Sequence, residues 1–286
     1  MSDIDDAASV RGRLAATLRH LRHRADLSGD QLATLLGVSQ SKISRIENGR
    51  TPPSVADVQA WARACGAPDE TVEVLIGRAE EALTEARTWR KELAGGLGAK
   101  QEQVGRLEAD AQVIRVFQHT IVPGLLQTAE YARRVLMLAN PSGRGDIGAG
   151  VAARLERQQA LFDETKRFEL VIGEAALRWP VASPPAMLGQ LDRIGALLDL
   201  PHVDIGIIPL DLDGPAPTLL PHAFCVFGDD PDDALVTVET LTAELHLRDP
   251  RDVRAFLDTF ARLRQVAAQG ADARALLAPI AAGFRR

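Results

Sequence analysis

The sequence predicts a protein of two domains, in which an all-α domain of five helices precedes a mixed α/β domain. The length of 286 residues suits two domains of modest size. The N-terminal part shows only helical spacing of apolar residues, interrupted by helix-capping residues. Further along, short apolar runs alternate with helical patterns. We therefore expect domains over residues 1–68 and 111–286, joined by connecting helices over 69–110.

The composition is that of a folded chain that works inside the cell. Apolar residues make up 46% of it and charged residues 25%, which excludes a wholly disordered chain. The longest apolar run, about 275–284, is too short for a membrane helix, and the acidic N-terminus is unlike a secretory signal. Cys65 and Cys225 form neither a disulfide framework nor a metal-ligand spacing. We expect a cytoplasmic protein that does not associate with membranes.

Positive charge is concentrated near the N-terminus. Residues 9–65 contain nine Arg or Lys against four Asp or Glu, a net charge of +5, whereas the whole chain carries −6. A basic segment on an acidic chain is typical of a nucleic-acid-binding domain with a separate second domain. A charge of this size also arises by chance, so the argument depends on the local pattern.

The first three helices are defined by apolar spacing and by caps. Helical spacing of Val10, Leu14, Leu18, Leu21 and Ala25 predicts a helix over 9–25. A capping box of Ser28 and Gln31 opens the second helix, and Gly37 ends it in the left-handed conformation. Ser39 caps a third helix that runs to about Glu47.

Two further helices complete the all-α domain. Ser54 and Asp57 form the next capping box, and Gly66 ends that helix. Its inward side chains are expected to be Val58, Trp61, Ala62 and Cys65. A fifth, longer helix should begin at Pro68 and extend to about Leu93.

The second and third helices are separated by very few residues, which is the spacing of a helix-turn-helix. A sharp turn between packed helices requires a small residue, a glycine at the turn and two apolar anchors on the following helix. Ala33, Gly37, Ile43 and Ile46 supply these in order. The alternative is a plain helical hairpin used only for packing.

The third helix would present short polar and guanidinium side chains to solvent. If Ile43 and Ile46 are buried, the outward residues are Ser41, Ser44, Arg45 and Asn48, flanked by Gln40 and Lys42. Side chains of these types can hydrogen-bond to base edges in a major groove. The start of the second helix, with its free N–H groups and Gln31, suits a phosphate.

The stretch from Gln31 to Arg50 resembles the phage-repressor/Cro-like (XRE) helix-turn-helix family. This resemblance implies binding to double-stranded DNA. It implies base contacts from Gln40, Ser41, Lys42, Ser44 and Arg45, and phosphate contacts from Gln31, Arg50 and Arg19. One recognition helix covers only a few base pairs, so we expect a homodimer on a pseudo-palindromic site.

The remainder of the chain alternates between strands and helices. Strands are expected over about 113–121, 168–172, 203–209, 223–227 and 235–240. Helices are expected over about 99–110, 128–138, 151–163, 185–200, 250–267 and 272–284.

Motifs for catalysis, cofactors and metals fail on their context. A GxGxxG match at 143–148 follows a helix and Asn140-Pro141, whereas a dinucleotide site needs a preceding strand. Acidic clusters at 211–214 and 229–233 are typical of turns between strands. The histidines have no ligand spacing, and we find no HExxH, GxSxG or Cys–His arrangement. We expect no cofactor, no metal and no enzymatic activity.

Three charged residues in apolar surroundings are candidates for a ligand pocket. Glu174 and Glu239 each follow an apolar strand-like run, and Arg157 lies on a helix with Arg154. Carboxylates at strand ends that face an arginine could line one concave site. The alternative is that these residues form structural ion pairs.

Several segments of this half resemble the DUF5753-type domain of antitoxin-like regulators from actinobacteria. The resemblance rests on residues 122–132, 154–158, 173–178, 190–191 and 205–209. It implies DNA-binding regulation, often beside a gene for a small partner protein. Three functions remain open: a regulator that senses a small-molecule effector or a partner protein, an antitoxin-like protein that neutralises a small partner and autoregulates its operon, and an enzyme that retains a helix-turn-helix domain.

Overall fold

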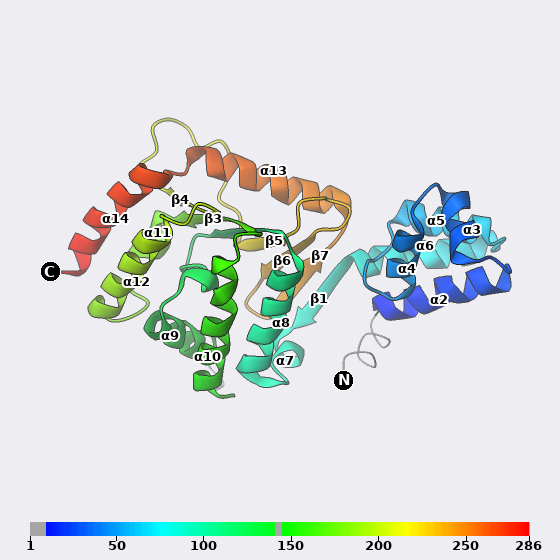
Figure 1. Ribbon diagram of the computed structural model, residues 1–286, viewed down its shortest axis with the longest axis horizontal. Helices are drawn as coiled ribbons and strands as arrows, with labels where there is room; N and C mark the ends of the chain where they lie inside the picture. Colours follow the sequence, from blue (N-terminus) through cyan, green and yellow to red (C-terminus); the bar gives the residue numbers. More distant parts are fainter. Residues whose placement is uncertain (1–9, 141–144, 286) are drawn as a thin grey trace. The chain divides into compact units, whose positions relative to one another are not determined.

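The computed structural model describes residues 10–140 and 145–285 (Figure 1). The GxGxxG match therefore begins outside the described residues. The chain divides into two compact units. The first unit comprises Met1–Ala86 with His246–Asp249, and the second comprises Arg87–Leu245 with Pro250–Arg286.

The first unit contains the five expected helices. They are α2 (Val10–Arg24), α3 (Gly29–Leu36), α4 (Gln40–Glu47), α5 (Val55–Ala64) and α6 (Asp69–Leu83). Helix α6 ends at Leu83, ten residues before the expected end at about Leu93. The chain continues as strand β1 (Thr84–Thr88) and the short helix α7 (Trp89–Glu92).

The core of the first unit gathers apolar residues from every helix. Leu14, Leu18, Leu32, Ile43, Ile46, Val58 and Trp61 are all at most 1% exposed. Trp61 is fully buried, and its indole Nε1 donates a hydrogen bond to the carbonyl oxygen of Leu18 at 3.1 Å. Val72, Leu75 and Ala79 of α6 belong to the same core. Helix α6 is thus part of the all-α unit rather than a connector.

A seven-stranded sheet is the centre of the mixed α/β fold. Its strands are β1, β2 (Val113–Gln118), β3 (Arg167–Gly173), β4 (Val203–Ile208), β5 (Phe224–Phe227), β6 (Leu235–Glu239) and β7 (Ala243–Leu247), in the spatial order β1-β7-β6-β5-β2-β3-β4. Strands β2, β3 and β4 run parallel, whereas β5 is antiparallel to both β2 and β6. Helices connect the parallel strands, as such pairings require.

Helices cover both faces of this sheet (Figure 1). They are α8 (Gly96–Asp110), α9 (Ala129–Ala139), α10 (Ile147–Arg157), α11 (Glu174–Arg178), α12 (Pro184–Leu197), α13 (Pro250–Val266) and α14 (Gly270–Phe284), with 3-10 helices η1 (Gly124–Leu126) and η2 (Gln158–Phe162). Tyr131 of α9 and Leu191 of α12 pack in one core with Val116. On the opposite face Phe256 of α13 contacts the ring of Phe224.

Several details differ from the sequence-based expectations. Helix α11 was not predicted because it has only five residues, and strand β7 was not predicted because its buried positions hold the polar residues Glu244 and His246. The helix expected over 151–163 begins at Ile147, and its last turn and a half is the 3-10 helix η2. The segment expected to connect the domains contributes Asp69–Leu83 to the first unit and Gly96–Asp110 to the second.

Candidate nucleic-acid interface

The turn between α3 and α4 is built from the residues that the sequence singled out. Ser28 Oγ accepts a hydrogen bond from the Gln31 N–H, and Gln31 Oε1 accepts one from the Ser28 N–H at 2.7 Å. Gly37 has a φ of 68°, a left-handed conformation that a residue with a Cβ adopts only with strain. Ser39 then caps α4 through its hydrogen bond from the Lys42 N–H. The predicted helix-turn-helix is confirmed.

Helix α4 is anchored on one side and accessible on the other. Ile43 and Ile46 are 1% exposed and fix its inner face to the core. Gln40 and Ser41 are exposed at its N-terminal end, and Ser44 and Arg45 are half-buried further along. The polar residues predicted to contact bases thus lie on the part of α4 that does not enter the core.

Lys42 has an intramolecular partner that the sequence did not reveal. Its ammonium Nζ lies 3.1 Å from the carboxylate of Asp57, which is also the capping-box residue of α5. The start of α4 is therefore tied to the start of α5. Lys42 can contact DNA only if its ammonium group leaves the Asp57 carboxylate, or if it binds this carboxylate and the DNA together.

Arg19 is likewise engaged within the unit. Its guanidinium donates to the carbonyl oxygen of Glu47 and to Asn48 Oδ1, so it binds the C-terminal end of α4. A free C-terminal carbonyl is an attractive site for a cation. In this structure Arg19 supports α4, whereas Gln31 and Arg50 are exposed.

A two-point ion pair between Arg22 and Glu47 also holds α4 to α2. Arg22 Nε lies 2.6 Å from Glu47 Oε1, and Arg22 Nη2 lies 2.9 Å from Glu47 Oε2. Hydrogen bonding to Glu47 raises the pKa of Arg22. Sequence reasoning missed this pair because its residues lie on different helices and share no local spacing. The pair fixes the far end of α4, as Ile43 fixes its middle.

These features define a helix-turn-helix domain, the class of fold that presents one helix to DNA. Residues 13–75 match a family model described as a helix-turn-helix domain. Residues 101–279 match the model of DUF5753, described as a domain of unknown function, and the chain belongs to this family. No curated protein and no solved structure matches the chain. Within the described residues, every helix is too short or too polar to cross a membrane.

The three residues expected to share a pocket in the second unit have different surroundings. Glu174 accepts hydrogen bonds from Arg178 Nε at 2.7 Å and from the Leu210 N–H at 2.8 Å. Glu239 is the last residue of β6 and is exposed to solvent, although the surrounding residues of the protein limit its hydration. This reduced hydration raises the pKa of Glu239, the negative charge of Glu244 adds to the shift, and the positive charges of Lys100, Arg154 and Arg157 oppose it. Glu174 is held by Arg178 and by the backbone of Leu210, so its partners differ from the charged groups that act on Glu239.

Arg157 belongs to a buried polar network between α8 and α10. Its guanidinium binds Glu108 and also Gln101 Oε1, at 3.2 Å from Nε. Arg154 donates to Gln101 Oε1 at 2.9 Å and to Gln127 Oε1 at 2.7 Å. Burial lowers the pKa of Arg154 to about 10 and raises that of Glu108. These contacts favour the structural alternative for Arg157, since its hydrogen bonds go to protein partners.

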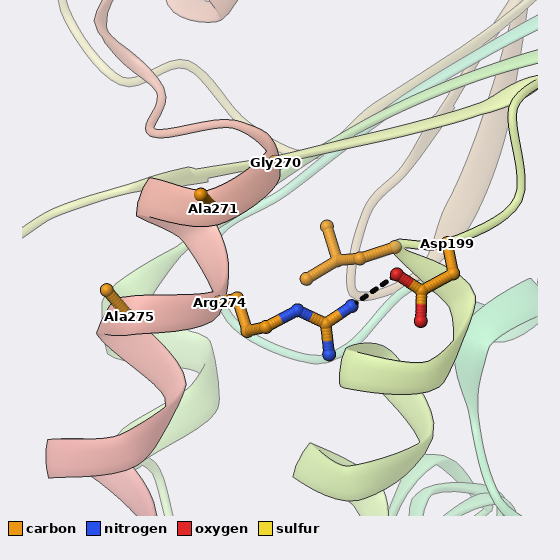
Figure 2. A pocket seen from close by; sticks show the side chains of 6 residues that line it. Asp199, Gly270, Ala271, Arg274 and Ala275 are labelled. Carbon is orange, nitrogen blue, oxygen red and sulfur yellow. Dashed lines mark hydrogen bonds and ion pairs between the residues drawn. The ribbon is translucent and has the colours of Figure 1, made fainter.

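The hollows among the described residues of the second unit include one beside α14 and one beside η2. One lies between the end of α12 and the start of α14, where Arg274 extends across the space and pairs with Asp199 at 2.6 Å (Figure 2). The other lies beside η2 and α12. In the described part of the chain, no group of three His, Cys, Asp or Glu side chains is placed to hold a metal ion.

Proposed function

We propose that this protein is a cytoplasmic, sequence-specific transcriptional regulator of the XRE type that inserts α4 into the major groove. The observation that carries the proposal is the two-sided character of α4. Ile43 and Ile46 anchor it, while Gln40 and Ser41 are exposed at the end that would enter the groove first. The N-terminal residues of a recognition helix are the ones that reach base edges.

Contacts with DNA divide into those that read bases and those that fix position. Gln40, Ser41, Ser44 and Arg45 would contact bases, and Lys42 would join them by exchanging Asp57 for DNA. Gln31 and Arg50 would contact phosphates, since both are exposed and lie at the ends of the helix-turn-helix. Arg19 would act mainly through α4, because its donors already bind Glu47 and Asn48.

Two arginine variants separate base reading from attraction to the DNA backbone. Arg45→Ala should cost roughly 1–3 kcal/mol of binding free energy on the specific site and blur the preference at one base pair, because a guanidinium makes two parallel hydrogen bonds to guanine. Arg50→Ala should weaken binding to all sequences alike and lower the salt slope by about 1.

The measurement is a salt titration of both variants on the specific duplex and on random duplexes. Arg50→Ala is the matched control, since it removes the same charge outside the helix. Equal losses on both duplexes for Arg45→Ala would show that α4 does not read bases.

The protein should bind DNA as a homodimer on two half-sites about 34–36 Å apart, or at a multiple of this spacing. A single α4 covers too few base pairs to select one site in a genome. Size-exclusion chromatography with light scattering gives the mass of the complex, and footprinting gives the spacing. A monomer that protects one short site would contradict this prediction.

The second unit is proposed to regulate the first by binding a small-molecule effector or a small partner protein. Its separate hydrophobic core supports a distinct role for this unit. A binding role is favoured over an enzymatic one, because Glu174, a candidate catalytic acid, already accepts hydrogen bonds from Arg178 and from the Leu210 N–H. The antitoxin-like alternative would be favoured if the product of a neighbouring gene bound the full chain and regained its own activity when this protein was removed.

A further inference from the structure

A mainly apolar groove lies on the second unit between η2 and α12. Its volume is about 530 Å³. The apolar lining comes from Phe162, Ala196, Leu197 and Leu200, and polar groups of Thr128, Asp192 and Arg193 complete the lining. Phe162 is 56% exposed although it is a large aromatic residue. Grooves of this size with apolar walls and few polar groups are typical of small-ligand sites.

Arg193 lines the groove and, like Arg154 in the described part of this unit, has no carboxylate paired with its guanidinium. Its Nη2 donates to Gln158 Oε1 at 2.9 Å, while its Nε is buried and has no hydrogen-bond acceptor. Across the described residues no carboxylate oxygen lies within 4.0 Å of the Arg193 guanidinium, whereas a carboxylate pairs with each of Arg115, Arg157, Arg178, Arg264 and Arg274. Burial lowers the pKa of Arg193.

The buried side chain of Gln158 fixes the position of the Arg193 guanidinium. Gln158 is 3% exposed, and its amide Nε2 donates to the carbonyl oxygens of Gly124 and Gln127, both at 2.9 Å. The amide oxygen of Gln158 is thereby directed to Arg193. A half-buried cation held in an apolar groove without a counter-charge is costly unless an anion joins it.

The hollow between α12 and α14 provides the contrast, because there Arg274 is paired with Asp199 (Figure 2). The groove at Arg193 differs from it by having no such ion pair among the described residues. Asp192 lies in the lining of the groove but is exposed and hydrated, and it does not pair with Arg193. Its charge would weaken the binding of an anion only modestly.

We propose that the groove binds a small molecule in which a carboxylate is joined to an apolar group. The carboxylate would lie on the Arg193 guanidinium, whose planar N–H groups suit this anion. The apolar group would pack on Phe162, Leu197 and Leu200. The assignment rests on the proposed effector role of the second unit and identifies the chemical class of the effector.

The test uses the full chain with 4-phenylbutyrate as the probe and 4-phenylbutyramide as its neutral counterpart. Calorimetric titration should show the acid binding at least tenfold more tightly than the amide. Arg193→Met should weaken binding of the acid at least tenfold, whereas Arg274→Met, the matched control at the other hollow, should not. Asp192→Asn should tighten binding about twofold to threefold by removing a like charge.

A variant that fills the groove tests the same site without changing its charge. Ala196→Trp places a large ring over the apolar wall and should abolish binding of both probes, with circular dichroism confirming that the variant is folded. Equal binding of acid and amide, unchanged affinity in Arg193→Met, or absence of binding at millimolar concentration would each overturn the assignment.

The effector role is tested separately by DNA affinity with and without the probe. Binding at Arg193 that leaves DNA affinity unchanged would support the groove and contradict the effector role. A change in DNA affinity that disappears in Arg193→Met would support both.

Discussion

Replacing Trp61 by alanine should unfold the DNA-binding unit and abolish DNA binding under conditions where the second unit stays folded. Trp61 is 0% exposed and contacts the core, and its Nε1 bonds to the Leu18 carbonyl oxygen. Large-to-alanine changes at such aromatic positions cost about 3–5 kcal/mol, because they remove buried apolar surface and leave a cavity. The lost hydrogen bond also leaves a buried carbonyl without its partner.

The measurement is chemical denaturation followed by circular dichroism, with DNA binding recorded on the same sample. Trp179→Ala is the matched control, because Trp179 is 67% exposed and its removal should change the free energy of unfolding by at most about 0.5 kcal/mol. If Trp61→Ala retained DNA affinity and stability, the packing of α5 described here would be wrong.

The helix-turn-helix could be predicted because its rules are local. Ser28 and Gln31 are three residues apart, and Gly37 needs only its own backbone freedom. The same holds for Ser54 with Asp57, where both capping hydrogen bonds are present. The anchors Ile43 and Ile46 follow from helical periodicity, and both are buried.

Interactions between distant residues could not be predicted in the same way. Arg22 and Glu47 lie 25 residues apart, so no periodic pattern relates them. Lys42 has the right type and position for DNA, but only the fold brings Asp57 to it. The end of α6 at Leu83 was also missed, because no glycine or proline marks it and the next such residue along the chain is Gly95.

The pocket expected from Arg157, Glu174 and Glu239 depends on the order of the strands, which is not a local property of the sequence. Each glutamate does follow a strand, but β3 and β6 are not neighbours in the sheet. Glu174 accordingly binds Arg178 of its own helix α11 and the backbone of Leu210. The order of the strands in the sheet decides which charged residues lie close together, and no local sequence pattern specifies that order.

A buried lysine in the second unit provides the other large expected effect. Lys100 is 6% exposed, and its Nζ lies 2.9 Å from Glu92 Oε2 and 2.6 Å from Glu244 Oε2. Lys100 Nζ also lies 5.5 Å from the centroid of the Trp89 ring, whose Nε1 donates to the Thr240 carbonyl oxygen. One cation thus joins α7, α8 and β7.

Lys100→Met should lower the free energy of unfolding of the second unit by about 3–5 kcal/mol near neutral pH. The methionine fills a similar volume, but the largely buried carboxylates of Glu92 and Glu244 lose the ammonium group that both contact, while Glu92 keeps its longer contact with Arg87 at 4.0 Å. Arg106→Met is the control, since it removes one positive charge from an exposed position on the same helix. It should change stability by at most about 0.5 kcal/mol.

Removal of one carboxylate identifies the cause of this loss. Adding Glu244→Gln to Lys100→Met should recover part of the lost stability near neutral pH, and a double-mutant cycle measures the coupling between Lys100 and Glu244. A deficit that Glu244→Gln leaves unchanged would show that Lys100 stabilises the unit through packing of its methylene chain on Trp89 rather than through charge.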